Sequence, residues 1–349
     1  MNLFSRGIIL YMEKIRVGVL RGGTSSEYNV SLKTGDSVLR HLPEHKYFPV
    51  DILVTKDGVW HIGGRPTDLP KVSRRVDVVF NALHGEYGED GKVQRLFEHF
   101  GIPFTGSRAL SSALGMNKAL SKEIFRKHGL KTAVHDVISS CRMREDVKNN
   151  DTLAFLVFEI LGVVPLPLIV KPVSGGSSVN TFKVHNAKEL IGAIERLAKV
   201  APGSTSLTTG NILFEEFIEG KEATCGVIDS FRGQEAYSLL PVEIRPPTHK
   251  TFFDYEAKYS GSSKEVCPGN FTREESAKIQ NMAKLAHKAL GLRHYSRSDF
   301  ILGKDGIYIL ETNTLPGLTD ESLLPKSLQA VGSNLPEFLD HIIGLAMQK

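Results

Sequence analysis

Short apolar runs alternate with amphipathic segments along the first third of the chain. Three runs rich in β-branched and aromatic residues predict buried strands: residues 15–20, 48–54 and 76–83. The first run ends at Gly22-Gly23, and the Thr and Ser residues that follow predict a cap for a helix near residues 31–40. Strands that alternate with helices favour a parallel α/β sheet, in which ligands bind at the carboxyl ends of strands. Gly22-Gly23 and His84-Gly85 both occupy such ends.

The rest of the chain contains both apolar runs typical of strands and apolar positions at helical spacing. Helical spacing of apolar positions predicts four helices: residues 117–128, 187–200, 272–290 (capped by Thr272) and 335–347. Apolar runs predict strands at residues 168–170 and 212–218, and a hairpin over 300–310 that turns at Asp305-Gly306. Residues 106–115, rich in Ser, Ala and Gly, are typical of a domain junction. Residues 246–270 lack periodicity, and so long a loop is usually functional or disordered.

Composition excludes several classes of protein. The 349 residues allow two or three domains, and 41% hydrophobic with 23% charged residues is ordinary for a globular protein. The net charge of +4, without a long basic run, argues against a nucleic-acid partner. Three scattered cysteines predict reduced thiols rather than a zinc site or a disulfide framework. No apolar run approaches the roughly 20 residues of a membrane helix. Residues 1–12 lack a cleavage site and predict a disordered or strand-extending leader, with Met12 as an alternative start.

A Gly/Ser-rich loop follows the predicted strand at residues 168–170. Lys171-Pro172 leads into residues 174–178 (SGGSS), where small residues allow close backbone approach to a phosphate and successive N–H groups form an anion nest. The Lys171 ammonium is placed to pair with phosphate oxygens. The loop lacks the G-x-x-x-x-G-K-[ST] pattern, so the P-loop class does not fit. Taken alone, a flexible surface turn explains this loop equally well.

Oxygen-bearing side chains gather on the predicted hairpin. Asp299 and Glu311 stand on its two arms, and Asn313 points to the same face as Glu311 because it lies two residues further along the strand. Hard oxygen ligands grouped in this way suit Mg²⁺, whereas a solvated polar strand face is the alternative. The turn at Pro316-Gly317 either presents the Gly317 N–H to a ligand or is a plain turn.

Together these features resemble ATP-grasp ligases and, among them, the D-alanine–D-alanine ligase family. The ATP-grasp order is Lys171-Pro172 with its loop, a Glu-Glu strand, Asp299, Glu311-x-Asn313 and Pro316-Gly317. The motifs that resemble the D-alanine–D-alanine ligases are residues 22–27 (GGTSSE) with 30–31, 83–85 (LHG), 88–91 (GEDG), 116–118 (MNK), 255–259 (YEAKY) and 313–319 (NTLPGLT). The match extends from Ile15 to the C-terminus, and a fixed order of separated motifs is highly specific.

The resemblance implies an α/β, three-domain ATP-grasp fold, in which an N-terminal parallel α/β domain is joined to central and C-terminal domains that grip ATP. It divides the chain into a leader (1–14), an N-terminal α/β substrate domain (15–106), a central ATP-grasp domain (107–217) and a C-terminal catalytic domain (218–349). The implied reaction joins two D-alanines through a D-alanyl phosphate, uses ATP with two Mg²⁺ (or Mn²⁺) ions, releases ADP and phosphate, and supplies peptidoglycan precursor. The implied assembly is a cytoplasmic homodimer, without a nucleic-acid or membrane partner.

The resemblance also assigns roles to single residues. The implied ATP contacts are Lys118, Lys171, Ser177, Ser178, Glu215, Glu216, Phe217, Ile218 and Glu222, and the implied metal ligands are Asp299, Glu311 and Asn313. The implied contacts to the two D-alanines are Glu27, His84, Lys258, Arg297, Gly317, Ser322 and Leu323. The implied catalytic set is Glu27, Ser177, Tyr259, Arg297, Gly317 and Ser322. In that set, Arg297 and the Gly317 N–H form the oxyanion site. A trio of Glu27, Ser177 and Tyr259 holds the long loop shut against water.

Structural alternatives remain for four of these residues. Glu27 can support the N-terminus of a helix, and His84 can be a satisfied histidine at a strand end. Tyr259 can simply pack, and Ser322 can be only a helix cap.

The chain departs from the family pattern at two positions. Asn180 stands where the family has Gly, and Asn tolerates the left-handed backbone conformation, so we expect the change to be tolerated. Asn29 stands where the family often has an acid. The cationic Lys258 favours an amine over D-lactate as nucleophile, whereas D-serine stays open.

Two other functions stay open. One is an ATP-grasp ligase for different amino or hydroxy acids. The other is a nucleotide-binding regulatory module, which is disfavoured because Arg297, Asp299 and Glu311 are all present.

Overall fold

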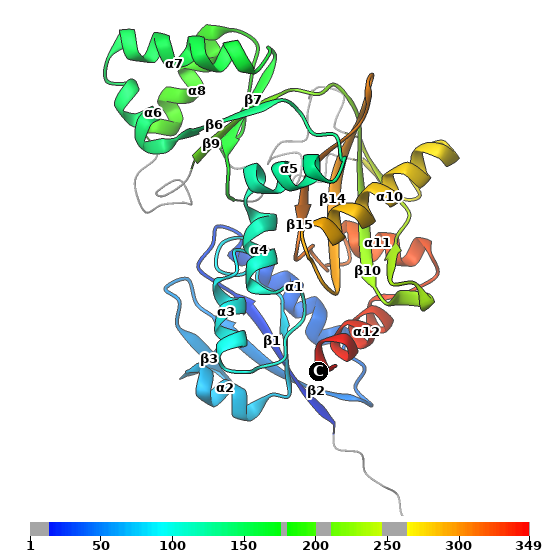
Figure 1. Ribbon diagram of the computed structural model, residues 1–349. Helices are drawn as coiled ribbons and strands as arrows, with labels where there is room; N and C mark the ends of the chain where they lie inside the picture. The colour runs from blue at the N-terminus through cyan, green and yellow to red at the C-terminus, as the bar shows by residue number, and fades with distance from the viewer. Residues whose placement is uncertain (1–13, 176–179, 200–210, 246–263, 349) are drawn as a thin grey trace, which may run out of the picture.

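Three separate β-sheets organise the described part of the chain (Figure 1). The computed structural model describes residues 14–175, 180–199, 211–245 and 264–348. One sheet lies within residues 15–81, a second within residues 135–216 and a third within residues 220–313. The mixed α/β architecture expected from the sequence is therefore present.

The first sheet is mixed, with the order β4-β3-β2-β1-β5. Its parallel strands are β1 (Ile15–Gly22), β2 (Tyr47–Val54) and β5 (Val78–Asn81), which confirms the three predicted strands. An antiparallel extension, which was not predicted, is formed by β3 (Trp60–Ile62) and β4 (Arg65–Thr67). Gly63 and Gly64 join these strands with φ of 58° and 75°, and a Gly-Gly pair is well suited to so tight a hairpin.

Helix α1 (Tyr28–His41) begins earlier than predicted and without a Ser/Thr cap. Glu27 is its N-cap residue, and no side chain caps the helix. Ser25 is otherwise engaged, because its hydroxyl donates to the His84 carbonyl oxygen at 2.6 Å and accepts the Glu27 N–H at 3.2 Å. Ser31, inside the helix, ties the sheet together, since its hydroxyl accepts the Gly22 N–H and donates to the Ala82 carbonyl, both at 2.8 Å. The predicted cap was therefore wrong: Ser25 bonds to the His84 carbonyl instead, and Ser31 lies inside the helix.

Helices cover one face of the second, antiparallel sheet. Its strands follow the order β6 (His135–Ser139), β9 (Asn211–Glu216), β7 (Leu168–Pro172) and β8 (Phe182–Val184). The covering helices are α6 (Ser140–Asp146), α7 (Asn150–Val163) and α8 (Ala187–Ala198), of which only α8 was predicted (Figure 1). Leu156, Val170, Ile194 and Phe214 belong to the core between helices and sheet. Side chains alternate along a strand, so Lys171 and Glu215 point to the opposite face.

The third sheet is antiparallel throughout. Its main path is β13 (Lys264–Val266), β12 (Val242–Arg245), β10 (Gly220–Asp229), β14 (Tyr295–Gly303) and β15 (Gly306–Asn313), and β11 (Ala236–Ser238) pairs with β10. The 3₁₀ turn η2 (Phe231–Gly233) precedes β11. The predicted hairpin is β14–β15, and α10 (Arg273–Ala289) packs its Ile279 and Ala283 onto this sheet. Thr272 caps α10 in a capping box with Glu275, as the sequence predicted for the cap.

The other helices of the described chain lie between the sheets in sequence, after the last strand, or within the first sheet's segment. Helix α4 (Ala109–Met116) occupies the residues expected to be a junction, and it leads directly into α5 (Lys118–Lys127). After β15 come α11 (Leu323–Ala330) and α12 (Leu335–Met347). The bounds of α12 match those of the predicted terminal helix. The first sheet's other helices are α2 (Leu69–Arg75) and α3 (Lys92–His99).

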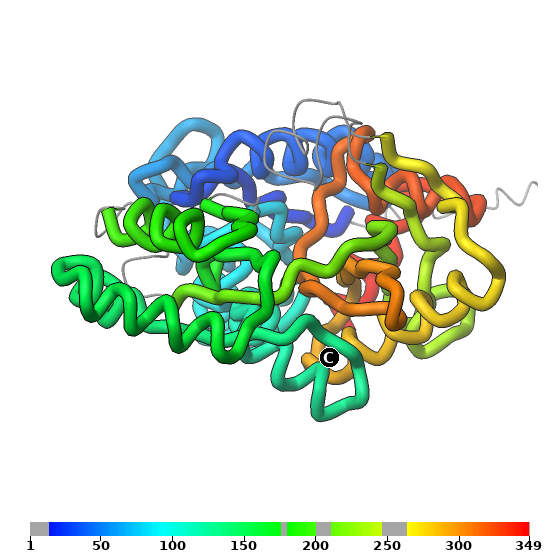
Figure 2. The backbone as a smooth tube through the Cα atoms, turned by 90° about the horizontal axis from the view of Figure 1, so that it is seen from above, coloured from blue at the N-terminus to red at the C-terminus, as the bar shows by residue number. Residues whose placement is uncertain are grey.

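The two ends of the described chain share one core. Phe338 and Ile342 of α12 join Val17, Val19 and Phe80 of the first sheet in a single apolar cluster. Seen from above, the helices of the second sheet and the C-terminal third extend to opposite sides of the first sheet (Figure 2). Within the described ranges, none of the helices combines the length and the apolar character needed to cross a bilayer.

Candidate functional site

Two lysines from different elements share one buried carboxylate. Glu215 lies on β9, one of its oxygens is 2.8 Å from Lys122 Nζ of α5, and the other contacts Lys171 Nζ of β7. Burial by itself raises the pKa of Glu215, but the two ammonium groups lower it to about 2. Burial opposes the charge on Lys171 as well, yet Glu215 and then Glu311 raise its pKa. Glu215 and Lys171 are therefore charged at neutral pH, whereas burial lowers the pKa of Lys122 although Glu215 opposes this effect.

A third lysine, on the same helix as Lys122, contacts the third sheet. Asn117 caps α5 by accepting the Leu120 N–H, which makes Lys118 the first residue of the helix. Lys118 Nζ donates to the Gly175 carbonyl oxygen at 2.7 Å and lies 3.1 Å from Glu311 Oε2. Lys118 therefore bridges the end of the Gly/Ser loop and the hairpin, and ammonium groups placed in this way suit a polyphosphate.

The predicted metal ligands share one face of the β14–β15 hairpin. Asp299 lies directly opposite Glu311 in the strand register, and Asn313 lies opposite Arg297. A register shift leaves Leu310 as an extra residue in β15, because Phe300 pairs with Ile309. The extra residue shifts the alternation of side chains along β15 by one position, so that Glu311 and Asn313 lie on the same face as Asp299. Without it, Glu311 would point toward the α10 core.

Arg297 and Asp299 form a bidentate ion pair. Both nitrogen–oxygen distances are 3.0 Å, and the Thr224 hydroxyl adds a hydrogen bond to Asp299 at 2.6 Å. Burial works against the guanidinium charge, but Asp299 and then Glu311 raise the pKa of Arg297 above its ordinary value.

These oxygens fit a divalent cation. Asp299 and Glu311 are hard carboxylate ligands on adjacent strands, balanced here by Arg297 and Lys118. The amide oxygen of Asn313 accepts the Leu315 N–H at 2.8 Å, which leaves it a second lone pair. No group of three His, Cys, Asp or Glu residues arranged for a metal occurs in the described part of the chain. A cation here would thus depend on the two carboxylates, Asn313 and oxygens of its ligand.

The turn after β15 brings Gly317 against Ser322. A Cβ atom at Gly317 would lie 2.9 Å from the Ser322 hydroxyl oxygen, so only glycine fits without movement. Ser322 occupies the N-cap position of α11, but its side chain makes no cap bond and instead accepts the Thr319 N–H at 3.1 Å. The simple helix-cap alternative therefore does not describe its side chain. Leu323 follows, half-buried, as the first residue of α11.

The first sheet contributes Glu27 and His84. A Cβ atom at Gly85 would lie 2.7 Å from Glu27 Oε2, so the carboxylate lies directly over the His84-Gly85 turn. His84 is buried, with Nε2 2.8 Å from the Thr34 hydroxyl and Nδ1 3.5 Å from Glu89. Both ring nitrogens have partners, as in the satisfied-histidine alternative. The hydroxyl of Ser37 on α1 donates to the Leu318 carbonyl at 2.8 Å, which joins this region to the Gly317 turn.

The other predicted residues continue from β9 into β10. Glu216 ends β9, and Phe217 follows it beneath Lys183, whose Nζ lies 3.5 Å from the ring centroid. Ile218 packs with Ile301 and Tyr308. Glu222 lies opposite Ile301 on the face that also carries Asp299. Ser177, Ser178, Lys258 and Tyr259 lie outside the described residues.

Sequence reasoning missed Lys122, Thr224 and Lys183. A signal existed for Lys122, which lies four residues after Lys118 and hence on the same helical face. Thr224 and Lys183 carried no such signal, because strand pairing alone brings them to the site.

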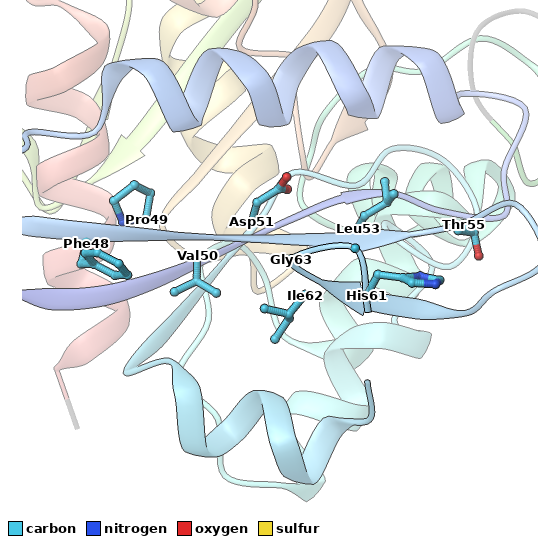
Figure 3. A pocket seen from close by; sticks show the side chains of 10 residues that line it. Phe48, Pro49, Val50, Asp51, Leu53, Thr55, His61, Ile62 and Gly63 are labelled. Atoms are coloured by element: carbon cyan, nitrogen blue, oxygen red, sulfur yellow. The ribbon is translucent and has the colours of Figure 1, made fainter. Parts of the chain in front are cut away.

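A surface pocket of about 460 Å³ lies elsewhere, at the edge of the first sheet (Figure 3). Phe48, Val50 and Ile62 lie on one side of β2, and Asp51 lies on the other. The Asp51 carboxylate already accepts two hydrogen bonds of 2.7 Å from Arg21. None of the predicted site residues lines this pocket, which therefore is not the candidate site.

Two family models match the chain. The model described as D-ala D-ala ligase N-terminus matches residues 16–71 and 64–107, and the D-ala D-ala ligase C-terminus model matches residues 124–344. A D-alanine–D-alanine ligase of Desulfotalea psychrophila is 38% identical over 343 residues, covering 97% of this chain and 96% of that protein. One of Syntrophobacter fumaroxidans is 37% identical over 343 residues, covering 96% of this chain and 99% of that protein.

Solved structures are similar over the same length. The VanG D-Ala:D-Ser ligase of Enterococcus faecalis matches with a TM-score of 0.79 and 29% identity, covering 96% of this chain and all of that one (100%). The D-alanine–D-alanine ligase of Bacillus anthracis complexed with ATP matches with a TM-score of 0.74 and 32% identity, covering 95% of this chain and 97% of that one.

Proposed function

This chain belongs to the D-alanine–D-alanine ligase family, and on that premise we propose how its residues carry out the reaction. The protein is an ATP-dependent ligase with the ATP-grasp fold that joins two D-alanines for peptidoglycan synthesis. The roles of single residues, the metal ions and the assembly are our proposals. One observation supports them above all: helix α5 carries both Lys122, which pairs with Glu215, and Lys118, which lies 3.1 Å from Glu311 of the hairpin.

ATP binds across the second and third sheets. Lys118 and Lys171 pair with its phosphates, together with Ser177 and Ser178 of the Gly/Ser loop. The strand from Glu215 through Glu216 and Phe217 to Ile218 holds the adenine, and Glu222 contacts the ribose. The apolar face formed by Ile218, Ile301 and Tyr308 supports this placement, because an adenine ring prefers such a surface.

Two Mg²⁺ or Mn²⁺ ions fit Asp299, Glu311 and Asn313. When bound, they neutralise the phosphoryl group that is transferred. Lys118 and Arg297 neutralise Glu311 and Asp299 in this structure, so both cations are free to turn toward phosphate or substrate oxygens once metal binds.

The first D-alanine lies between the first sheet and the hairpin. Glu27 anchors its ammonium group, with His84 holding the turn beneath, and its carboxylate attacks the γ-phosphate of ATP to give D-alanyl phosphate and ADP. This step is needed because a carboxylate is a poor electrophile. Arg297 and the Gly317 N–H then stabilise the tetrahedral oxyanion that forms when the second amine attacks and phosphate leaves.

The second D-alanine is held by its carboxylate. Lys258 and Ser322 contact that carboxylate, and Leu323 lines the methyl pocket. The trio of Glu27, Ser177 and Tyr259 keeps the loop over the site closed, which excludes water that would hydrolyse the acyl phosphate.

Phosphate release with D-alanine as the sole amino acid tests this proposal. We expect release that requires both ATP and Mg²⁺, with D-alanyl-D-alanine formed in equal amount, and no release with L-alanine. Hydrolysis of ATP that is unaffected by D-alanine would instead indicate a nucleotide-binding module. Turnover with chelated metal would contradict the metal sites.

The second subsite is open to a related amino acid. D-serine adds one hydroxyl to D-alanine, which a pocket of this kind rejects weakly. D-lactate lacks the amine, and the cationic Lys258 disfavours it. Competition between the three with labelled D-alanine measures the preference, and dominant D-lactate incorporation at neutral pH would contradict the role of Lys258.

We also propose that the enzyme is a cytoplasmic homodimer. The support is the family resemblance alone, and sedimentation at micromolar concentration tests the assembly.

A further inference from the structure

Lys122 is the most deeply buried cation near the site. Its side chain has 0% exposure, whereas that of Lys171 has 14%. A lysine this buried is rare unless it is paired. Its partner is Glu215, at 2.8 Å. Since solvent does not reach Lys122, a phosphate bound at the surface of Lys171 does not contact it, and the contacts that connect Lys122 with Lys171 run through Glu215.

Glu215 divides its charge between two lysines. One oxygen faces Lys122 and the other contacts Lys171. With both lysines protonated, the trio carries a net charge of +1, because two ammonium groups share one carboxylate. Burial lowers the pKa of Lys122, and the Glu215 carboxylate at 2.8 Å opposes this effect. Without Lys122, Glu215 and Lys171 would form a neutral pair in a buried place, where ion pairing is strong. The pair as a whole would then have no net charge to offer an anion.

Nothing else described around Glu215 replaces this charge. His135 pairs with Glu215 in the strand register, but burial lowers the pKa of His135, so its imidazole is neutral at pH 7. Lys118 is engaged with Glu311 and Gly175. Only Lys122 supplies the second cation to Glu215.

We propose that Lys122 is a positioning residue for ATP, which holds one oxygen of Glu215 and so leaves Lys171 a net charge for the phosphates. The inference rests on the proposed role of Lys171 as a phosphate contact. It predicts that the effect of Lys122 on ATP depends on the charge of Glu215.

A double-mutant cycle with calorimetric titration of ATP, in the absence of D-alanine, tests this dependence. We expect Lys122→Met to weaken ATP binding about ten-fold or more, with the KM for D-alanine changed less than two-fold. In a Glu215→Gln background the same substitution changes ATP affinity less than two-fold. The matched control is Lys127→Met, which removes the same charge from an exposed position of the same helix and leaves ATP binding unchanged.

Several outcomes overturn the inference. ATP affinity of Lys122→Met within two-fold of the wild type, while Lys171→Met binds weakly, refutes it and leaves the proposed function standing. If Lys122→Met weakens ATP binding equally in the wild-type and Glu215→Gln backgrounds, Lys122 has only a structural role and the inference is refuted. If Lys171→Met also keeps normal affinity, the phosphate role itself fails. If the single variant does not fold, the double variant is compared with Glu215→Gln, and ten-fold weaker binding by the double variant refutes the idea.

Discussion

His294 should make the enzyme less stable as the pH falls from 7 to 5. It lies between α10 and β14 with φ of 69°, and its Nδ1 accepts the Gly106 N–H at 3.1 Å, which requires the neutral ring. Its own backbone N–H donates to Asp229 at 2.5 Å. Burial, and then the neighbouring Arg293, lower the pKa of His294 to about 3, although Asp229 opposes this. The smaller contributions of His287 and His341 also lower it.

The size of the effect follows from proton linkage. In the unfolded chain this histidine has an ordinary pKa of about 6.5. Between pH 6.5 and 3 the unfolded state therefore binds a proton that the folded state does not, so the free energy of unfolding falls as the pH falls. The stabilisation is fully present above about pH 6.5, and a drop from pH 7 to 5 removes about 2 kcal/mol.

The variant His294→Asn isolates this contribution. Asn tolerates a positive φ and does not titrate in this range. Urea unfolding should be measured at pH 7, 6 and 5. Between pH 7 and 5, the free energy of unfolding of the wild type should fall by about 2 kcal/mol more than that of the variant. His185→Asn, at an exposed histidine, should follow the wild type. If the free energy of unfolding fell equally in the wild type and in His294→Asn, the idea that His294 is buried in its neutral form would be refuted.

Three other predictions concern the hairpin, the Gly317 turn and α10. Arg297→Ala should lower kcat for ligation about 100- to 1,000-fold, as measured by phosphate release, and normal turnover would refute the oxyanion role. Gly317→Ala should also lower kcat, because its Cβ would lie 2.9 Å from the Ser322 hydroxyl. Adding Ser322→Ala should relieve this clash, and a crystal structure of the double variant should then show the turn at residue 317 in its original geometry. Thr272→Ala removes the capping box and should cost about 1 kcal/mol of stability in thermal unfolding, with the KM for ATP unchanged. A shift in that KM would indicate that α10 influences the nucleotide site.

Local sequence was sufficient to predict those elements whose helical spacing, capping residue or turn residues lie within the element itself. The helix α12 and the cap of α10 were predicted from spacing and from Thr272 alone. Asn180, expected to tolerate a left-handed backbone, has φ of 60°. A hairpin turned at Asp305-Gly306 was predicted, and Asp299 and Glu311 stand on its two arms. Each of these depends on residues only a few positions apart.

Elements that lack a regular alternation of polar and apolar residues were harder to predict. The helix α7 was missed because it carries Phe155 and Phe158 on its exposed face, which blurs the polar–apolar alternation that marks an amphipathic helix. The strand β10 was missed for a similar reason, since six consecutive residues from Ala223 are buried and no period of two remains.

The sequence by itself determined the family, the order of the motifs and the chemical character of the site, because these depend on residue identity. Tertiary structure decided which groups meet. The Leu310 bulge decides the face that Glu311 occupies, and the packing of α5 on β9 brings Lys122 to Glu215. The physical reason is that strand register and burial depend on contacts between distant segments. A lysine's charge is visible in the sequence, but the carboxylate that shares it is found only in the folded chain.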